Sequence, residues 1–250
     1  TNQEAVDLHI QAFRIAEALS VPVMVCMDGF ILTHATERID MPTQEEVDRF
    51  LPPFEPRQVL DPAEPVSIGA MVGPEAFMEV RWLGHRKQLE ALELIPQVAA
   101  EFRAVFGRDS GGLLRSYRTD DAETIVVALG SVNGTVQETV DALREDGMKI
   151  GSVAITSFRP FPIVPLRVAL RRAKRVVVLD KSLAPGIGGI LSDGVRKALS
   201  GIVLKGYTVI AGLGGRAITQ ASLARLFTAA ARDELDAVTF LDLNRELVLG

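Results

Sequence analysis

The sequence predicts an α/β protein with a mainly parallel sheet, and the second half of the chain carries the evidence. Short apolar runs typical of buried strands recur from residue 124 to residue 241, and stretches with helical spacing of apolar residues separate them. Strands and helices that alternate in this way form a parallel sheet with helices on both faces. The chain has 250 residues, of which 48% are hydrophobic, enough for one large core or two ordinary ones.

The elements of this second half follow one another in a regular order. Strands are predicted at 124–129, 149–155, 175–179, 205–211 and 237–241. Helices are predicted between them, at about 135–146, 164–173, 188–199 and 219–232. Thr135 and Glu138 have the spacing of a capping box, so the first of these helices is expected to begin at Thr135.

The first half is expected to open with a helix and a strand. Apolar residues recur at helical spacing from Ala5 to Leu19, which predicts an amphipathic helix over about 3–19. The run VPVMVCM at 21–27 is apolar on both faces and predicts a strand inside a covered sheet. Cys26 lies in this run and is interpreted as a small buried hydrophobe rather than a reactive nucleophile.

A proline-rich connector and a long helix are expected next. Seven prolines within residues 40–74 exclude a long helix or a central strand, although a short helix is expected at 45–51. Helical spacing over about 75–106 predicts a helix that Pro96 kinks or splits. The apolar side chains expected to hold the connector against the protein surface are Phe50, Leu51, Phe54, Val59, Leu60, Val66 and Ile68.

A domain boundary is predicted at the glycine-rich segment FGRDSGG, residues 106–112. It divides the chain into a first domain at 1–112 and a second domain at 113–250. Residue 1 lies almost at the cap of the first helix, so the sequence is expected to be a piece of a longer polypeptide.

Composition excludes several classes of function. The net charge is −5, and the 27 basic residues are scattered, which argues against a nucleic-acid-binding surface and a polybasic membrane anchor. The apolar stretch at 18–27 is about half a membrane span and contains a proline, so no membrane segment is expected. One cysteine cannot hold an iron–sulfur cluster. With no visible signal peptide, a cytoplasmic location is expected.

The segment SFRPFP at 157–162 follows a predicted strand, where the loops of α/β proteins face ligands. Pro160 restricts Arg159 to an extended conformation, and the prolines beside it predict a rigid exit from the strand. Because a guanidinium pairs with a carboxylate through two hydrogen bonds, Arg159 is interpreted mainly as an interface residue. A substrate- or phosphate-binding role for Arg159 stays open.

Two glycine clusters, APGIGGIL at 184–191 and AGLGGRAIT at 211–219, resemble phosphate-binding loops. Neither fits the dinucleotide or P-loop pattern, although each precedes a predicted helix whose N-terminus could hold an anion. The favoured interpretation is a tight turn that requires glycine dihedral angles. The interface candidates in the second cluster are Gly212, Gly214, Gly215 and Arg216.

Polar residues follow the predicted strand at 21–27, where they could line a cleft. They are Asp28, Thr33 and His34, and they are candidates for residues near a substrate. The three histidines lack the spacing of metal ligands, so no metal ligand is assigned. No catalytic residue is assigned either, because no triad order or paired-carboxylate motif is present.

Several segments, in order, resemble alpha subunits of the pyruvate:ferredoxin oxidoreductase family, whose members depend on thiamine diphosphate. The resemblance covers essentially the whole chain and is specific as a set. The segments are TNQEAVDLHIQAFRIAE, PVMVCMDGFILTH, LDPAEPVSIGAMVGPEAFMEVRW, FGRDSG, YRTDDAETIVVALGSVNGTVQETVDALREDGMKIGSVAITSFRPFP, VVVLDKSLAPGIGG and IAGLGGRAIT. It implies that the first domain resembles the C-terminal part of a thiamine-pyrimidine-type domain, and the second a transketolase C-terminal-like domain.

The resemblance also implies a reaction, its cofactors and its partner subunits. Pyruvate is decarboxylated oxidatively with coenzyme A to acetyl-CoA and CO2, and electrons pass to ferredoxin. Thiamine diphosphate with Mg²⁺ is shared with a partner subunit, and 4Fe–4S clusters lie on the beta, gamma or delta partners, none on this chain. The family's cofactor-activating Glu, with the Thr and Arg that hold the substrate carboxylate, would precede Thr1, so this chain alone is expected to be inactive.

Two alternatives remain from the sequence. One keeps the family but changes the substrate to 2-oxoglutarate, a branched-chain 2-oxoacid, phenylglyoxylate or oxalate, with NAD as a possible final acceptor. The other makes residues 114–250 a non-catalytic assembly domain that joins subunits through Arg159 and the loop from Gly212 to Arg216.

Overall fold

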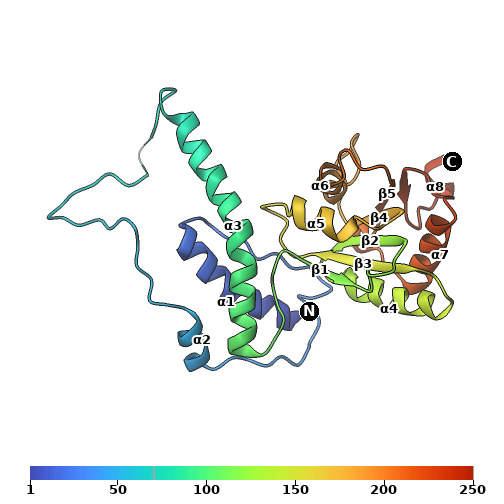
Figure 1. Cartoon of the computed structure of the whole chain (residues 1–250), viewed down its shortest axis with the longest axis horizontal. Helices are drawn as coiled ribbons and strands as arrows, with labels where there is room; N and C mark the ends of the chain where they lie inside the picture. The colour runs from blue at the N-terminus through green and yellow to red at the C-terminus, as the bar shows by residue number, and fades with distance from the viewer. Residues whose placement is uncertain (70, 250) are drawn as a thin grey trace. The chain divides into compact units, whose positions relative to one another are not determined.

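The computed structural model describes residues 1–69 and 71–249, and the chain forms two compact units (Figure 1). Unit 1 comprises Thr1–Cys26 and Thr36–Gly112. Unit 2 comprises Met27–Ala35 and Leu113–Gly250. The short segment Met27–Ala35 therefore belongs with residues that follow it by about a hundred positions, a long-range association that the sequence pattern does not reveal.

Unit 1 is helical. Its helices are α1 (Asn2–Leu19), α2 (Gln44–Phe50) and α3 (Phe77–Phe106), and all three were predicted. Their core is an aromatic cluster in which the Phe102 ring stacks on Phe106 and meets Phe50 edge-on. Pro96 lies inside α3 without splitting it. The predicted split is therefore wrong, because helical residues continue on both sides of Pro96, and the kink stays a prediction.

Two further expectations for this region are wrong. Residues 21–27 form no strand. A strand needs a pairing partner, and this run pairs with none of the strands of the sheet, which lie within residues 114–240. Cys26 is consequently exposed rather than buried.

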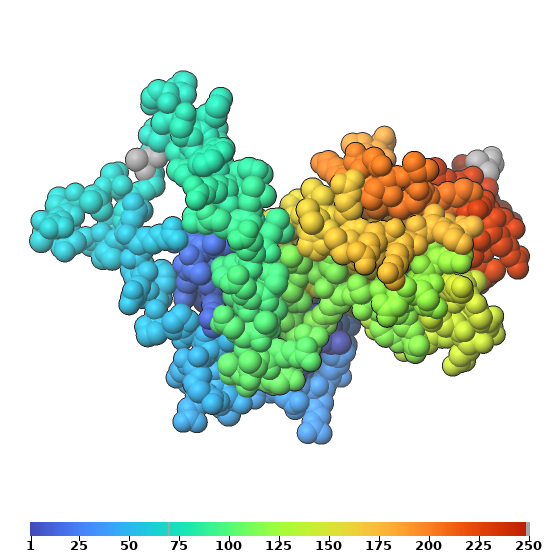
Figure 2. Space-filling view, viewed as in Figure 1, coloured from blue at the N-terminus to red at the C-terminus, as the bar shows by residue number. Residues whose placement is uncertain are grey.

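The proline-rich connector does not lie against the helices as expected. Phe50 is buried and Leu51 is half-buried, but the connector's other apolar side chains are exposed: Phe54, Val59, Leu60, Val66 and Ile68. Figure 2 shows this part of unit 1 as a thin loop with open space beside it. The prolines prevent regular structure, and few neighbours are available to cover the apolar side chains.

Unit 2 is a six-stranded sheet in the order β1-β3-β2-β4-β5-β6. Its strands are β1 (Leu114–Tyr117), β2 (Thr124–Leu129), β3 (Ile150–Ile155), β4 (Arg175–Asp180), β5 (Lys205–Ile210) and β6 (Val238–Phe240). All pairs are parallel except β1, which runs antiparallel to β3 at the edge. Five strands were predicted, and β1 was missed because it is short and half polar.

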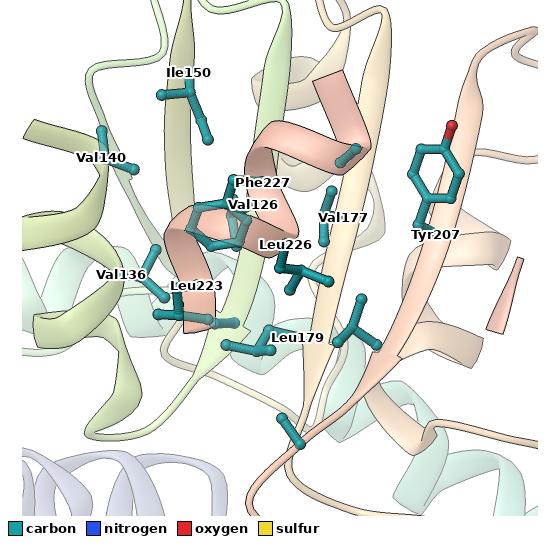
Figure 3. Packing of buried hydrophobic residues seen from close by; sticks show 14 of the residues in the cluster. Val126, Val136, Val140, Ile150, Val177, Leu179, Tyr207, Leu223, Leu226 and Phe227 are labelled. Atoms are coloured by element: carbon teal, nitrogen blue, oxygen red, sulfur yellow. The ribbon is translucent and has the colours of Figure 1, made fainter. Parts of the chain in front are cut away.

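Helices cover both faces of this sheet. They are α4 (Val132–Glu145), α5 (Ile163–Leu170), α6 (Ile190–Ala198) and α7 (Gln220–Ala231), with a short α8 (Glu246–Leu249) near the end of the chain and a 3-10 turn at Leu213–Gly215. Alternate residues of each strand face opposite sides. Val126 packs beneath α4 and α7, whereas Ile125 packs beneath α5 and α6. Figure 3 shows Phe227 of α7 lying over Val126. The predicted parallel α/β class is confirmed.

The crossover from β4 through α6 to β5 and the crossover from β5 through α7 to β6 differ in hand. The steps from β4 to β5 and from β5 to β6 run in the same direction across the sheet, yet α6 and α7 cover opposite faces. The two crossovers therefore have opposite hands, and left-handed crossovers are rare.

The first helix of unit 2 starts earlier than predicted. Helix α4 begins at Val132 with Ser131 as its N-cap, so Thr135 lies inside the helix and the predicted capping box is not formed. The Thr135 carbonyl instead accepts a hydrogen bond from the Thr139 hydroxyl at 2.7 Å.

The strand order places a switch point between β2 and β4. From β2 the chain passes through α4 to β3 on one side, and then through α5 back to β4 on the other side. Ligands of open α/β sheets usually bind in the crevice at such a point, beyond the carboxyl ends of the strands. In this chain Gly130 and Ser131 follow β2, and Lys181 follows β4, so these residues mark the switch point, and the place between them is called the switch-point crevice below.

Candidate functional site

The switch-point crevice contains a carboxylate from the same unit. Asp28 accepts a hydrogen bond from the Ser131 backbone N–H through Oδ2, at 2.6 Å, and from the Lys181 ammonium through Oδ1, at 2.7 Å. The N–H belongs to the N-cap of α4, where the helix dipole favours negative charge. Each carboxylate oxygen of Asp28 therefore has a donor.

The charge on Asp28 is stabilised by these partners. Burial raises the pKa of its carboxyl group, but hydrogen bonds from Lys181 and Ser131 and the Lys181 charge outweigh burial, so the pKa lies below its ordinary value of 3.8. Asp28 is therefore ionised at neutral pH and pairs with a charged lysine.

Gly130 makes room for this carboxylate. A Cβ atom at Gly130 would lie 2.9 Å from Asp28 Oδ2, and Gly130 has φ of +85°, a conformation that other residues rarely adopt. The turn after β2 thus depends on glycine both for its backbone angles and for the approach of Asp28.

Thr33 and His34 lie in the same segment as Asp28 but are exposed. The Thr33 hydroxyl accepts a hydrogen bond from the Phe30 backbone N–H at 2.9 Å and lies 3.2 Å from His34 Nδ1. The His34 ring stacks on the Phe30 ring with centroids 4.7 Å apart. The structure therefore brings the three substrate candidates into one turn and separates their surroundings. Asp28 is engaged in the crevice, whereas Thr33 and His34 are accessible.

The first glycine cluster also surrounds a carboxylate of its own unit. Asp180, which is 2% exposed, accepts hydrogen bonds through Oδ2 from the Ser192 backbone N–H at 2.9 Å and hydroxyl at 3.1 Å, in the first turn of α6. A Cβ at Gly189 would lie 2.1 Å from Asp180 Oδ2. The interpretation as a turn is favoured over an anion site, because Asp180 already holds the helix N-terminus.

The second glycine cluster forms a turn with its own cap. Gly212, Gly214 and Gly215 have φ of +69°, +65° and +83°, which explains why glycine stands at each position. The Thr219 hydroxyl accepts from the Ser222 backbone N–H at 3.1 Å and so caps α7. Arg216 is exposed and donates to the Asp242 carbonyl at 2.5 Å.

Arg159 lies on the surface of unit 2 and stacks on its own loop. Its guanidinium is 4.2 Å from the centre of the Phe158 ring, and it donates to the Phe158 carbonyl at 2.7 Å. Phe161 packs against Gly194 of α6, where an added Cβ would lie 2.5 Å from the ring. Among the described residues Arg159 has no ion-pair partner. The prolines and Phe161 thus hold an exposed cation in place.

In the described ranges no cluster of metal ligands is found, and the N-termini of α4, α6 and α7 in unit 2 are not free to hold a diphosphate. No group of three or more His, Cys, Asp or Glu side chains in the described ranges is placed to hold a metal ion. The N-termini of α4, α6 and α7 are occupied by Asp28, Asp180 and Thr219 respectively. No helix in the described ranges is long and apolar enough to span a membrane.

Asp28 is a candidate residue in the sequence, whereas its two partners, Ser131 and Lys181, are not. Ser131 was placed ahead of the helix that it caps, and Lys181 directly follows the run VVVLD at the end of β4. The position of Lys181 after a buried strand was a usable signal, whereas the pairing across 153 residues was not. The arrangement defines a doubly wound α/β unit whose usual ligand crevice is filled from within.

Known proteins with similar sequences identify the family. Residues 1–100 match the model "Pyruvate flavodoxin/ferredoxin oxidoreductase, thiamine diP-bdg", and residues 122–223 match "Pyruvate:ferredoxin oxidoreductase core domain II". The two matches together cover most of the chain. The chain belongs to the pyruvate:ferredoxin oxidoreductase family, a family that binds thiamine diphosphate.

The sequences of two curated relatives support the same family, and one solved structure shows a weaker likeness. Pyruvate synthase subunit PorA of Methanothermobacter thermautotrophicus is 40% identical over 98% of this chain, and the chain spans 64% of that relative's length. Ketoisovalerate oxidoreductase subunit VorA of Pyrococcus abyssi is 39% identical over 87% of this chain and 56% of its own length. A solved 2-oxoglutarate:ferredoxin oxidoreductase from Magnetococcus marinus aligns with 63% of this chain and 24% of its own, with 18% identity and a TM-score of 0.45.

Proposed function

We propose that this chain is part of the alpha subunit of a pyruvate:ferredoxin oxidoreductase. The whole enzyme would decarboxylate pyruvate oxidatively with coenzyme A, form acetyl-CoA and CO2, and pass electrons to ferredoxin. The observation that carries the proposal is the likeness to a pyruvate synthase subunit along almost the entire chain. Residues 1–112 would form the C-terminal part of the pyrimidine-side domain, and residues 113–250 the transketolase C-terminal-like domain.

Within this proposal the chain acts mainly as a scaffold. The N-termini of α4, α6 and α7, at the carboxyl edge of its sheet, are occupied by Asp28, Asp180 and Thr219, which supports a structural role for these three positions. Thr33 and His34 are exposed, and the hydrogen bonds of their side chains lie within their own turn. This supports a position near the 2-oxoacid.

Cofactors and partners are assigned by the same proposal. Thiamine diphosphate, held with Mg²⁺ at a site shared with a partner subunit, would supply the group that stabilises the carbanion formed on decarboxylation. The 4Fe–4S clusters would lie on beta, gamma or delta subunits. The single cysteine supports this, because a cluster requires about four thiolates. Arg159 and the turn from Gly212 to Arg216 would contact those subunits.

Purification of the native complex tests the proposal. Antibody capture of the subunit, followed by mass determination of each component and by iron and thiamine analysis, should return partner subunits, iron and thiamine diphosphate. A 2-oxoacid-dependent reduction of viologen dye should accompany the complex and should require coenzyme A. Recovery of the subunit without partners, iron or dye reduction would contradict the proposal.

A second candidate keeps the chemistry and changes the substrate. The VorA relative, named for ketoisovalerate, is almost as similar to this chain as the PorA relative, so a branched-chain 2-oxoacid is a specific alternative. The purified complex should be assayed against pyruvate, 2-oxoglutarate, 2-oxoisovalerate, phenylglyoxylate and oxalate, with ferredoxin and NAD as acceptors. The highest kcat/KM decides between the two candidates.

A third candidate makes unit 2 an assembly domain without a catalytic role. The exposed and stacked guanidinium of Arg159 favours it. Arg159→Ala should then weaken association with partner subunits by about tenfold or more, since anchoring arginines are frequent hot spots of interfaces. Arg172→Ala, an exposed arginine of unit 2 outside that loop, is the matched control. Unchanged association of Arg159→Ala would overturn the assembly role.

A further inference from the structure

The crevice at the switch point has the groups of an anion site. In this chain the N-cap N–H of α4 and the ammonium of Lys181 converge on one point, and both hydrogen-bond the same carboxylate. A backbone N–H at a helix N-terminus combined with a lysine is the arrangement that proteins use to bind phosphate. Asp28 therefore stands where a phosphate of a bound ligand would stand in a nucleotide-binding sheet.

The fit is close on every side of the carboxylate. The side chains of Asp28 and Lys181 are only 19% and 23% exposed, so water competes weakly for their hydrogen bonds. Gly130 leaves no Cβ in the way. Both oxygens of Asp28 are engaged, and its negative charge balances the Lys181 ammonium, so the attraction of this point for a second anion is reduced.

The segment that carries Asp28 has no regular secondary structure and exposes most of its apolar side chains. Met27–Ala35 contains no helix or strand, and its turn is closed by internal bonds, from Ile31 N to Gly29 O at 2.8 Å and from His34 N to Phe30 O at 3.2 Å. Phe30 and Ile31 are exposed, so the segment buries little apolar surface. Within residues 27–34 of the described chain, Asp28 is the residue whose side chain hydrogen-bonds the rest of unit 2.

We propose that Asp28 is an internal anion that fixes Met27–Ala35 in the switch-point crevice and thereby positions Thr33 and His34. Asp28 is then a positioning residue that does not contact the substrate, in contrast to the role expected from its place in the sequence. The switch-point crevice of unit 2 is occupied by the chain's own segment Met27–Ala35 and binds no nucleotide. The link to Thr33 and His34 as neighbours of a 2-oxoacid rests on the proposed function.

Hydrogen–deuterium exchange in the intact complex tests the anchor without any assay of activity. Asp28→Ala should raise the exchange of peptides covering residues 27–35 roughly tenfold to a hundredfold, the change expected on loss of a charge-assisted hydrogen bond. Lys181→Met removes the cation and should act in the same direction, and the double variant should add little to the larger single effect. Asp121→Asn, which breaks the exposed pair with Arg144 elsewhere in unit 2, should leave these peptides unchanged.

Kinetics of the same complexes test the positioning. Asp28→Ala should raise KM for the preferred 2-oxoacid by about tenfold or more, with a smaller change in kcat, and Asp28→Glu should restore part of the loss. Unchanged exchange at residues 27–35 in both Asp28→Ala and Lys181→Met overturns the anchor. Faster exchange with an unchanged KM overturns the positioning of substrate-facing groups. A wild-type complex that turns over no 2-oxoacid overturns the proposed function instead, and the exchange result still decides the anchor.

Discussion

Asp7 of α1 and Arg108, which follows α3, form a forked ion pair across 101 residues of unit 1. Arg108 Nη2 lies 2.8 Å from Asp7 Oδ1, and Arg108 Nε lies 3.0 Å from Asp7 Oδ2. The carboxylate is fully buried and also accepts from the Ser110 hydroxyl at 2.7 Å. A fourth bond, from the Gln11 amide to the Ser110 carbonyl, ties the same segment to α1. This network joins the first helix of unit 1 to the segment after its last helix.

Removal of the Asp7 charge should destabilise unit 1. Asp7→Asn leaves the Arg108 guanidinium half-buried without its counter-ion, and the expected cost is about 3 kcal/mol in the free energy of unfolding. Urea unfolding followed by fluorescence of Trp82, the single tryptophan and part of α3, measures it. Glu90→Gln, which removes an exposed partner of Arg86 and Lys87 on the same helix, is the control and should change little.

The same carboxylate predicts how stability depends on pH. Burial raises the pKa of Asp7, but hydrogen bonds from Arg108, Ser110 and Gln3 and the Arg108 charge outweigh it, so the pKa is lowered below its ordinary 3.8. The unfolded chain therefore binds a proton at higher pH than the folded chain does. The stabilisation is complete above the ordinary pKa and is lost as pH falls through the lower folded value. As pH falls from 5 into the acid range, the free energy of unfolding should decrease more for wild type than for Asp7→Asn. Parallel curves of unfolding free energy against pH would contradict this.

Gly189 is predicted to be required for space and not for its backbone angles. Its φ is −79°, which any residue adopts, but an added Cβ would lie 2.1 Å from Asp180 Oδ2. Gly189→Ala should cost about 1–3 kcal/mol, because Asp180 must leave the α6 N-terminus. Gly134→Ala in α4 is the matched control, since nothing lies within 4 Å of its Cβ position, and it should be neutral or stabilising. Equal stability of both variants would refute the role of Asp180 as the cap.

Phe227 should be the most costly truncation in unit 2. The ring is fully buried between α4 and the sheet, beside Leu223 and Val126. Phe227→Ala leaves a cavity and should lower the free energy of unfolding by about 3–5 kcal/mol. Leu247→Ala, at an exposed apolar side chain of α8, should have almost no effect in the same thermal or urea measurement. A small loss for Phe227→Ala would mean that the faces of the sheet are assigned wrongly.

The sheet could be predicted from the sequence because its signal is local. Runs such as TIVVAL in β2 and RVVVL in β4 are apolar on both faces, as a strand covered by helices must be. The antiparallel edge strand β1 reads LRSY, and nothing in four half-polar residues indicates a strand. The start of α4 was misplaced for a related reason: its N-terminal N–H is held by Asp28, far away in sequence, and not by a local capping box.

The candidate site could be predicted only in part. Polar residues at the end of an apolar run drew attention to Asp28, Thr33 and His34, but the run at 21–27 is not a strand. Met27–Ala35 groups with unit 2, and Asp28 of this segment pairs with Lys181, an association that no periodicity or motif encodes. The glycines around Gly189 resembled a phosphate loop but were interpreted as a tight turn, and the sequence did not reveal that Asp180 fills the space they leave.

Turnover by the isolated chain, compared with turnover by the native complex, tests the central claim most directly. This polypeptide of 250 residues, loaded with thiamine diphosphate, Mg²⁺, coenzyme A and pyruvate, should reduce no viologen dye above the rate without protein. The complex purified with its partner subunits should reduce the dye in a pyruvate-dependent manner. Pyruvate-dependent dye reduction by the isolated chain would contradict the account of this chain as a scaffold that requires its partners.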